Sequence, residues 1–356
     1  MQRQAVRIIT IVVALFLLGL VITTWFLSRP AFDESLTGAP LDGMEVLPLD
    51  AGLTFARLSL KEEVKLLIVR EITADGVQAI DVSYALQRQL QDPIVAFGLN
   101  GYDELEYVAR RATPQLVKWE ELTVPLDTSA SHIAAGTNFS AHAKEVGIED
   151  GPFLFPKLSQ PTAWNASVAN RGRLDYEAEL CAVPLTRLTK ERPAEFGYVL
   201  CNDFTDRWPL VRDVDFDKPM GTTGFTDGKG GEGMLPLGPF FVVPKNGNDF
   251  SRELTLELYL NGQLRQRSGA SQMIWSPQQI ASAAMEGCEQ VYESEAGEVK
   301  LTDCEGIAGG TLLLTGTPEG VMFSPATIWS PWAYLRPGDE VVLRAKWLGA
   351  LVNRIE

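Results

Sequence analysis

The chain has 356 residues, of which 46% are hydrophobic and 22% are charged. This is the composition of a folded globular protein with a sizeable core. Acidic residues outnumber basic residues by 46 to 31, which gives a formal net charge of −15, and the sequence has no obvious Lys/Arg-rich run. Such a chain repels polyanions, and we therefore exclude nucleic acid as a partner.

The first feature along the chain is an uncharged apolar run from Ile8 to Leu27. Its about 20 residues, at a rise of ~1.5 Å each, are enough to cross the ~30 Å hydrocarbon core of a bilayer. We therefore predict a transmembrane anchor within residues 1–29. A cleavable signal peptide is the alternative, but the run is longer than a usual signal-peptide core and no clear A-x-A cleavage site follows it.

The charges around this run predict its orientation. Arg3, Arg7 and the α-amine precede the run, whereas Arg29 is soon followed by Asp33 and Glu34. Because positive charge is retained in the cytoplasm, the N-terminus is expected there and the remainder of the chain on the periplasmic or extracellular side. The prediction is thus a single-pass membrane protein with a non-cytoplasmic domain.

Three further regions follow the anchor. Residues 30–52 are rich in Gly, Pro and Asp and are expected to form a linker. Residues 53–126 alternate strand-like and helix-like runs, which predicts a small α/β unit. Residues 127–356 consist mainly of short β-type runs between Gly/Pro turns, so the main domain is predicted to be α+β and β-rich.

The four cysteines argue against a zinc site. Cys181, Cys201, Cys288 and Cys304 show neither C-x-x-C nor Cys/His zinc spacing, and the chain has only two histidines. Cys288 and Cys304 bracket two short strand-like runs around a Gly-containing turn. An oxidising compartment would allow a disulfide across this hairpin, and two unpaired thiols are the alternative.

Two acidic residues in the run LDYEAELCAV suggest metal chemistry. Strand alternation places Glu177 and Glu179 on one face, where their like charges repel unless a cation lies between them. Asp203, at the end of the apolar run FGYVLCNDF, is a candidate third oxygen ligand for a hard divalent cation. Taken alone, an E-x-E pattern is more often a solvated strand edge.

Five short motifs surround these acids in a fixed order. They are Gly136-Thr137-Asn138-Phe139 running to His142 and Glu145, Tyr176-Glu177-Ala178-Glu179-Leu180, Asp203 to Arg207, Gly228-Lys229 ahead of Pro236-Leu237-Gly238-Pro239, and Thr315 to Val321. In this order they resemble the fumarylacetoacetate hydrolase superfamily over roughly residues 53–356. The resemblance implies a distorted β-roll or sandwich and a homodimer.

The resemblance also implies roles for individual residues. Glu177, Glu179 and Asp203 would bind Mg²⁺ or Mn²⁺. His142 and Glu145 would form a pair in which the carboxylate fixes the imidazole tautomer, so that the other ring nitrogen can take a proton from water.

Lys229 lies in a Gly-rich loop and would stabilise a developing enolate. A phosphate-binding loop fails on spacing, because three residues rather than four separate Gly224 from Gly228, and Gly230 stands where Ser or Thr is required.

The expected substrate contacts come from four further positions. Thr317 matches the family's substrate-carboxylate position, and Arg207 would also face the anionic substrate, with a surface salt bridge as the alternative. Asn138 and Lys157 complete the set, Lys157 in a supporting role. Trp208 and Gln272 depart from the common family pattern, which indicates an altered pocket rim.

These assignments predict metal-assisted hydrolytic cleavage of a C–C bond in a small acylpyruvate-like β-dicarbonyl or 2-oxo acid. Isomerisation, hydration and decarboxylation of related 2-oxo acids need the same ion and the same enolate stabilisation, and they stay open. A catalytically silent, membrane-tethered protein that binds a metal or a small acid is the rival from another class. The presence of His142, Glu145 and Lys229 argues against that rival.

Overall fold

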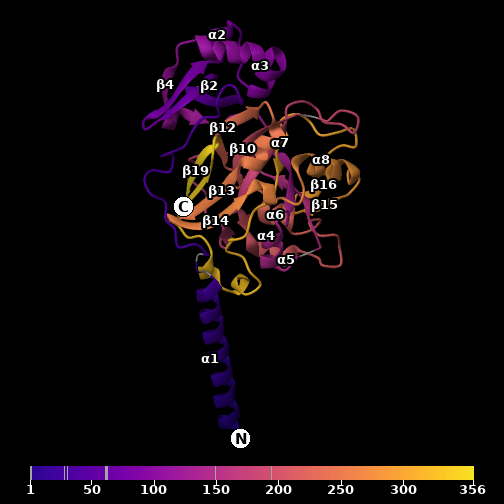
Figure 1. Cartoon of the computed structure of the whole chain (residues 1–356). Coiled ribbons are helices and arrows are strands. Elements are labelled where there is room, and N and C mark those ends of the chain that lie inside the picture. Colours follow the sequence, from indigo (N-terminus) through magenta and orange to yellow (C-terminus); the bar gives the residue numbers. More distant parts are fainter. Residues whose placement is uncertain (1, 28, 30, 61–62, 149, 194) are drawn as a thin grey trace.

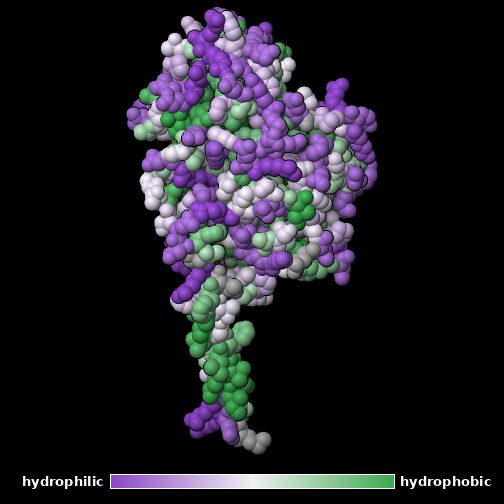
Figure 2. Space-filling model, in the orientation of Figure 1, coloured by the Kyte–Doolittle hydropathy of each residue, from purple (hydrophilic) through white to green (hydrophobic). Residues whose placement is uncertain are grey.

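The computed structural model describes residues 2–27, 29, 31–60, 63–148, 150–193 and 195–356. Helix α1 (Gln2–Leu27) projects from the body as a single rod (Figure 1). Within the described residues it is the one helix long and apolar enough to cross a membrane, and its apolar stretch is not buried by the body. Figure 2 shows it as a hydrophobic column below a body whose visible surface is mostly hydrophilic.

The body is built on one large mixed sheet. The sheet has 11 strands in the order β4-β3-β2-β1-β12-β10-β9-β17-β6-β7, with β5 paired to β1. The strands are β1 (Gly52–Leu60), β2 (Glu63–Thr73), β3 (Gly76–Asp81), β4 (Gln115–Lys118), β5 (Leu122–Thr123), β6 (Ser131–Gly136), β7 (Phe153–Leu158), β9 (Ala178–Pro184), β10 (Phe196–Asn202), β12 (Leu237–Pro244) and β17 (Leu313–Leu314).

A second, antiparallel sheet packs against the first. Its order is β14-β13-β18-β19, with β13 (Thr255–Leu260), β14 (Gln263–Gly269), β18 (Glu340–Ala345) and β19 (Gly349–Arg354). Two small ribbons pair β8 (Leu174–Asp175) with β11 (Thr205–Asp206), and β15 (Tyr292–Ser294) with β16 (Gly297–Val299).

The helices are short apart from α1 and α3. After α1 they are α2 (Val82–Leu86), α3 (Pro93–Arg111), α4 (Ser140–Val146), α5 (Arg207–Asp213), α6 (Phe225–Lys229), α7 (Gly247–Glu253) and α8 (Pro277–Glu286). Four 3-10 turns complete the set: η1 (Trp119–Glu121), η2 (Ala270–Gln272), η3 (Thr327–Trp329) and η4 (Pro331–Ala333). Figure 1 places α4, α5 and α6 in the half of the body nearest α1, and α2 and α3 at the opposite end.

Alternation along the central strands buries both faces of the large sheet. On β12, Phe240 enters the core between the two sheets, whereas Phe241 enters a second core beneath α2 and α3. Leu258 of β13 and Leu343 of β18 close the first core from the second sheet. The prediction of a β-rich α+β fold with a sandwich-like main domain is confirmed.

The N-terminal unit shares the large sheet with the rest of the chain. Strand β1 pairs antiparallel with β12, with Phe55 opposite Phe241. The region predicted as a linker also contacts the body, because Leu36 donates its N–H to the carbonyl of Gly262 at 2.8 Å and Glu34 pairs with Arg267 at 2.8 Å. Residues 32–36 therefore lie along the edge of β14.

All four cysteines form disulfides. Cys288 bonds to Cys304, which is the first of the two alternatives that the sequence left open, and the β15-β16 ribbon lies between them. Cys181 and Cys201 form a second bridge between the neighbouring strands β9 and β10, and both are fully buried. This second pair was not predicted from the sequence.

Candidate active site

The three candidate metal ligands come from the ends of two paired strands. Strands β9 and β10 are antiparallel, with Glu179 opposite Cys201. Glu177 precedes β9 and Asp203 follows β10, so this register brings the two ends together. The N–H of Asp203 donates to the carbonyl of Glu177 at 3.0 Å. Carboxylate oxygens of Glu177, Glu179 and Asp203 lie within 4.8 Å of one another, so all three could bind one cation.

Burial and neighbouring charges shift the pKa values of Glu177 and Glu179 in opposite directions. Burial alone would raise the pKa of Glu177, but Lys229 and Arg207 outweigh it and hold that pKa well below its usual range. Burial raises the pKa of Glu179 well above its usual range, and the like charges of Asp203 and Glu177 add to the effect. Without a cation of its own, Glu179 therefore favours the protonated form.

Two lysines, Lys157 and Lys229, partly neutralise the three carboxylates. Lys229 Nζ donates to Glu177 at 2.7 Å, to Asp203 at 2.8 Å and to the hydroxyl of Thr205 at 2.8 Å. Lys157 Nζ lies 2.6 Å from Asp203 Oδ1 and is fully buried. An ammonium has three N–H donors, and Lys229 uses two of them to hold carboxylates in place and the third on the hydroxyl of Thr205.

Arg207 is a buried ion-pair residue. Its guanidinium donates to Asp175 at 2.8 Å and to Glu177 at 2.6 Å, and it is 5% exposed. The alternative of a surface salt bridge is therefore wrong. Asp175 was not proposed from the sequence, although it lies two residues before Glu177 and the same alternation would have pointed to it.

Asp175 joins the cluster to a downstream loop. Its carboxylate accepts the N–H groups of Met322 at 2.9 Å and Phe323 at 3.0 Å, in addition to the guanidinium of Arg207. Four carboxylates thus face three cations, Lys157, Lys229 and Arg207. The cluster holds one excess negative charge when all of its acids are ionised.

Helix α4 places the predicted His–Glu pair beside these acids. His142 Nδ1 lies 3.1 Å from Glu145 Oε2, one turn along the helix. Glu145 also accepts the N–H of Gly320 at 3.0 Å, which fixes the carboxylate against the loop that carries Thr317. With Nδ1 engaged by the carboxylate, Nε2 of His142 is the ring nitrogen left to act as a base.

One pocket brings the polar residues together with an apolar wall. Its polar lining consists of His142, Glu177, Arg207, Lys229, Thr137 and Thr317. Its apolar lining includes Phe153, Phe155, Phe225, Phe323, Leu210 and Val146. Such a mixed lining suits a small molecule with an anionic or polar end and a short apolar part.

Thr317 is held by a residue that the sequence analysis missed. The buried side chain of Gln266, on β14, donates to the hydroxyl of Thr317 at 2.9 Å and accepts the N–H of Ala178 at 3.0 Å. It therefore links the threonine loop to the strand that carries Glu179. No local pattern marks Gln266, because its importance comes from the crossing of the second sheet over the first.

Asn138 does not have the position expected of a substrate contact. It is fully buried and is not part of the pocket lining. Its amide donates to the carbonyls of Thr315 and Trp275 at 2.8 and 2.9 Å, and its oxygen accepts the N–H of Trp275 at 2.6 Å. These backbone bonds leave no side-chain group directed at a ligand.

The bonds of Asn138 position a neighbouring turn instead. Gly316 follows Thr315 and donates its N–H to Glu179 at 2.7 Å. Its φ is +85°, and a Cβ at this position would lie only 2.9 Å from both Ala135 O and Asn138 Cβ, so larger residues are excluded. Asn138 thus acts on Glu179 through this turn. Lys157 likewise is fully buried and does not line the pocket, and its ammonium lies 2.6 Å from Asp203.

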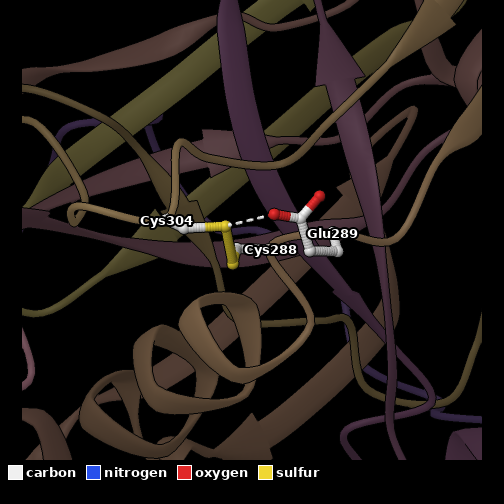
Figure 3. A group of neighbouring side chains, drawn as sticks. All are labelled: Cys288, Glu289 and Cys304. Carbon is white, nitrogen blue, oxygen red and sulfur yellow. Dashed lines mark hydrogen bonds between the residues drawn. A yellow bond between two sulfur atoms is a disulfide. The ribbon is translucent and has the colours of Figure 1, made fainter.

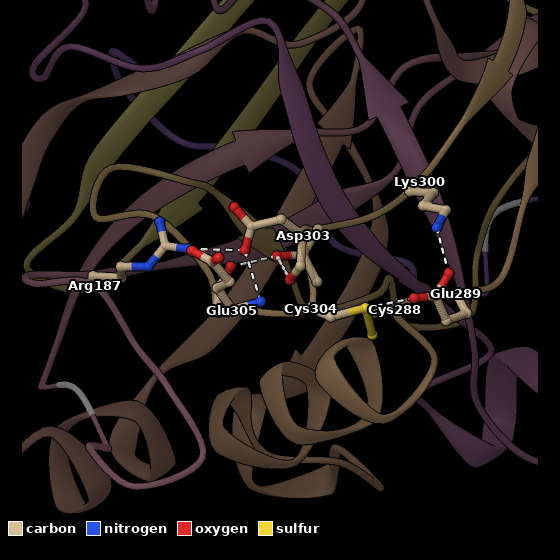
Figure 4. Close-up of a disulfide and its surroundings, with 9 residues drawn as sticks. Arg187, Cys288, Glu289, Lys300, Asp303, Cys304 and Glu305 are labelled. Carbon is tan, nitrogen blue, oxygen red and sulfur yellow. Dashed lines mark hydrogen bonds and ion pairs between the residues drawn. A yellow bond between two sulfur atoms is a disulfide. The ribbon is translucent and has the colours of Figure 1, made fainter.

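A second group of potential metal ligands, one glutamate and two cysteines, does not form a metal site. Cys288, Glu289 and Cys304 lie close together, but the two sulfurs are bonded to each other and supply no thiolate (Figure 3). Glu289 also pairs with Lys300 at 2.5 Å. Figure 4 shows that the surroundings of this disulfide are surface ion pairs, including Arg187 with Asp303 at 2.8 Å.

The fold and this site define a β-rich α+β protein with a buried three-carboxylate centre next to a His–Glu pair. The family model described as "Fumarylacetoacetate (FAA) hydrolase C-terminal" matches residues 131–356. The chain belongs to this family, as the motif resemblance implied.

Curated relatives carry several different activities. Oxaloacetate tautomerase YisK of Bacillus subtilis is 29% identical over 64% of this chain and 70% of its own length. A 2,4-didehydro-3-deoxy-L-rhamnonate hydrolase of Sphingomonas sp. is 30% identical over 64% of this chain and 73% of its own length. A 4-hydroxyphenylacetate degradation bifunctional isomerase/decarboxylase of Salmonella dublin is 28% identical over 68% of this chain, which spans 51% of that protein.

Solved structures agree on the fold. Fumarylacetoacetate hydrolase from the psychrophilic Exiguobacterium antarcticum aligns with a TM-score of 0.61 at 21% identity, over 85% of this chain and 99% of that one. At this identity the likeness concerns the fold alone. The homologues are thus enzymes of one family with hydrolase, isomerase, tautomerase and decarboxylase members.

Proposed function

We propose that this protein is a divalent-metal-dependent enzyme that acts on a small 2-oxo acid or β-dicarbonyl anion, and that it hydrolyses a C–C bond. The observation that supports this most strongly is the gathering of Glu177, Glu179 and Asp203 into one cluster, of which Glu177 lines the same pocket as His142 of the His142–Glu145 pair. A proton acceptor and an oxygen-ligand centre within one pocket are the requirements of metal-assisted hydrolysis.

The residues present fit Mg²⁺ or Mn²⁺. Three buried carboxylates offer the hard oxygen donors that these ions prefer. Among the residues that the structure describes, Glu179 is the one of the three without a basic partner, so its charge is the one that a cation would balance. When bound, the ion would polarise the oxygen atoms of the substrate.

The charge of the cluster also suits the proposed substrate class. With every acid ionised and every base protonated, four carboxylates against three basic side chains leave one excess negative charge, and a divalent cation, which would favour the ionised form of Glu179, would convert it to one excess positive charge. A substrate with a single carboxylate then balances these seven side chains, which do not include Glu145 of the His–Glu pair. Thr317 and Arg207 line the pocket where they could receive that carboxylate.

In the proposed reaction, His142, Glu145 and Lys229 have different roles. Nε2 of His142 takes a proton from water, and Glu145 holds the imidazole in the required tautomer. The resulting hydroxide attacks a carbonyl carbon, the adjacent C–C bond breaks, and the departing enolate accepts the proton that His142 took from water. Lys229 lines the pocket, and its positive charge stabilises the enolate without giving up its carboxylate bonds.

A second candidate function is isomerisation or tautomerisation, with hydration and decarboxylation as related possibilities. The tautomerase and isomerase relatives favour it, because both reactions proceed through an enol or enolate and need no attacking water. A catalytically silent binding protein is the third reading.

An assay of the detergent-solubilised full chain separates these readings. It would compare acylpyruvate cleavage with oxaloacetate tautomerisation in Mg²⁺ or Mn²⁺. Cleavage that EDTA abolishes supports the hydrolase, EDTA-sensitive tautomerisation without cleavage supports the second candidate, and no turnover on any substrate supports the silent protein.

We also propose that α1 anchors the protein in a membrane, with the catalytic domain on the non-cytoplasmic side. The apolar, unburied helix supports the anchor, and the two disulfides support an oxidising compartment. A homodimer, as the resemblance implies, completes the proposal. Cross-linking of the protein in native membranes would test it, and a monomer at all protein concentrations would contradict it.

A further inference from the structure

The end of the apolar helix is attached to one particular segment of the body, residues 322–335. Thr24, near the end of α1, is 2% exposed, and its hydroxyl lies 2.7 Å from the hydroxyl of Ser330, which is fully buried. Figure 1 shows this gold-coloured segment at the foot of the body, beside the upper end of the indigo helix. The 322–335 segment is therefore adjacent to the point where the helix leaves the body.

Large aromatic side chains are exposed at this junction. Trp329 and Trp332, on the consecutive turns η3 and η4, are 64% and 48% exposed, and Trp25 and Phe26 at the helix end are 53% and 60% exposed. Water-exposed clusters of large aromatics are unusual in soluble proteins. Tryptophan is enriched where a membrane protein meets the lipid headgroups, because its ring is apolar and its N–H needs a polar partner.

Electrostatic attraction to anionic lipid does not explain how this surface would bind a membrane. The chain beyond residue 29 has 28 basic and 46 acidic residues, because three of the 31 bases lie in the first 29 residues and none of the acids does. An excess of 18 negative charges, 46 minus 28, repels anionic lipid. The partner that fits this surface is the interface of a zwitterionic bilayer, reached through the aromatic rings.

The same segment forms part of the catalytic pocket. Phe323 lines the pocket, and its N–H and that of Met322 are held by Asp175, the partner of Arg207. Ser330 contacts the membrane helix a few residues further along. Other pocket residues come from α4, α5 and α6, which lie in the half of the body nearest α1 (Figure 1).

We propose that the 322–335 segment is a membrane-seating platform: Trp329 and Trp332 insert into the lipid headgroup region, and the rim of the catalytic pocket is held beside the bilayer surface. This proposal depends on the membrane span proposed for α1. It goes further, because a tether alone would leave the body free to tumble above the membrane.

Site-specific fluorescence in vesicles tests the platform and the span separately. Three single variants of the full chain, Val13→Cys, Trp329→Cys and Tyr84→Cys, would be labelled with an environment-sensitive fluorophore. The native cysteines are all disulfide-bonded and do not compete. Position 13 is near the middle of α1, and Tyr84, 77% exposed on α2 at the far end of the body, is the matched control.

The labelled proteins would be reconstituted into phosphatidylcholine vesicles that contain nitroxide lipids with a shallow or a deep quencher. We expect position 329 to lose roughly half of its fluorescence to the shallow quencher, position 13 to be quenched more by the deep one, and position 84 to be unaffected. Quenching at 13 without quenching at 329 overturns the platform and retains the span. Absence of quenching at 13 overturns both.

Discussion

The backbone N–H of Asp203 donates to the carbonyl of Glu177 at 3.0 Å, and this bond joins the ends of two strands at the point where their carboxylates converge. The pairing of β9 with β10 extends up to this bond. The geometry of the acidic centre therefore follows from the register of two buried strands and does not depend on a flexible loop.

Replacing the carboxylate of Glu179 should weaken metal binding without unfolding the protein. Glu179→Gln keeps the side-chain shape and the acceptor for the N–H of Gly316, but it removes the charge that a cation would balance. We expect the affinity for Mg²⁺ or Mn²⁺ to fall by at least about 100-fold, with activity lost in parallel. Calorimetric titration with each ion measures the affinity, and thermal unfolding in EDTA checks that the fold is unchanged.

The matched control is Glu286→Gln, an exposed acid on α8 away from the centre, which should leave affinity and activity unchanged. If Glu179→Gln binds both ions as tightly as the parent does, the assignment of Glu179 as a ligand is wrong.

Local alternation placed Glu177 and Glu179 on one face, but alone it favours a solvated strand edge. The roles of Asp203, His142 and Glu145 were predicted from the family resemblance. Asp175 follows the same alternation and could have been found. Gln266 could not, because its two contacts are made across the two sheets, and no short-range pattern encodes which sheets cross.

Long-range pairing also explains the other differences. The Cys181–Cys201 bridge depends on the register of β9 against β10, which sequence spacing leaves undetermined. Asn138 matched a family motif, and a motif does not reveal whether a side chain faces the pocket or the backbone behind it. Only the packing of its neighbours decides this.

The two disulfides should differ in their resistance to reduction. Cys181 and Cys201 are fully buried, whereas Cys304 is exposed at the surface. A thiolate must reach a sulfur atom to reduce it. We expect a mild reductant to open the 288–304 bridge in the folded protein and to open the 181–201 bridge only after unfolding. Non-reducing peptide mapping before and after treatment measures both, and free thiols at all four positions in native protein would contradict export.

Acid should destabilise the fold through His132. Burial, with a further contribution from the nearby Lys157 charge, lowers the pKa of His132 from 6.5 to about 4. Between these two values the unfolded chain binds a proton that the folded chain does not. The free energy of unfolding therefore falls as the pH falls through this window, and the contribution of His132 is fully present above about pH 6.5.

The expected size of this effect is about 2 kcal/mol between about pH 7 and about pH 5. His132→Asn retains an acceptor for the N–H of Leu312 but does not titrate in this range. Urea unfolding of the detergent-solubilised chain at the two pH values measures the difference. An equal pH dependence in the parent and the variant would show that His132 is not responsible.

The His–Glu pair gives the most direct test of the proposed proton transfer. His142→Asn removes the base but no carboxylate from the centre, so metal affinity should be retained. We expect kcat for hydrolysis to fall by about 100- to 10,000-fold, which is the usual contribution of a general base. Glu145→Gln should cause a smaller loss, because the imidazole remains but its tautomer is no longer fixed by a carboxylate.

Lys144→Gln, an exposed position on the same helix, is the control. Full hydrolytic activity in His142→Asn would transfer the role of base to another group, whereas retained tautomerisation with lost hydrolysis would show that His142 serves the attack of water and not the formation of the enolate.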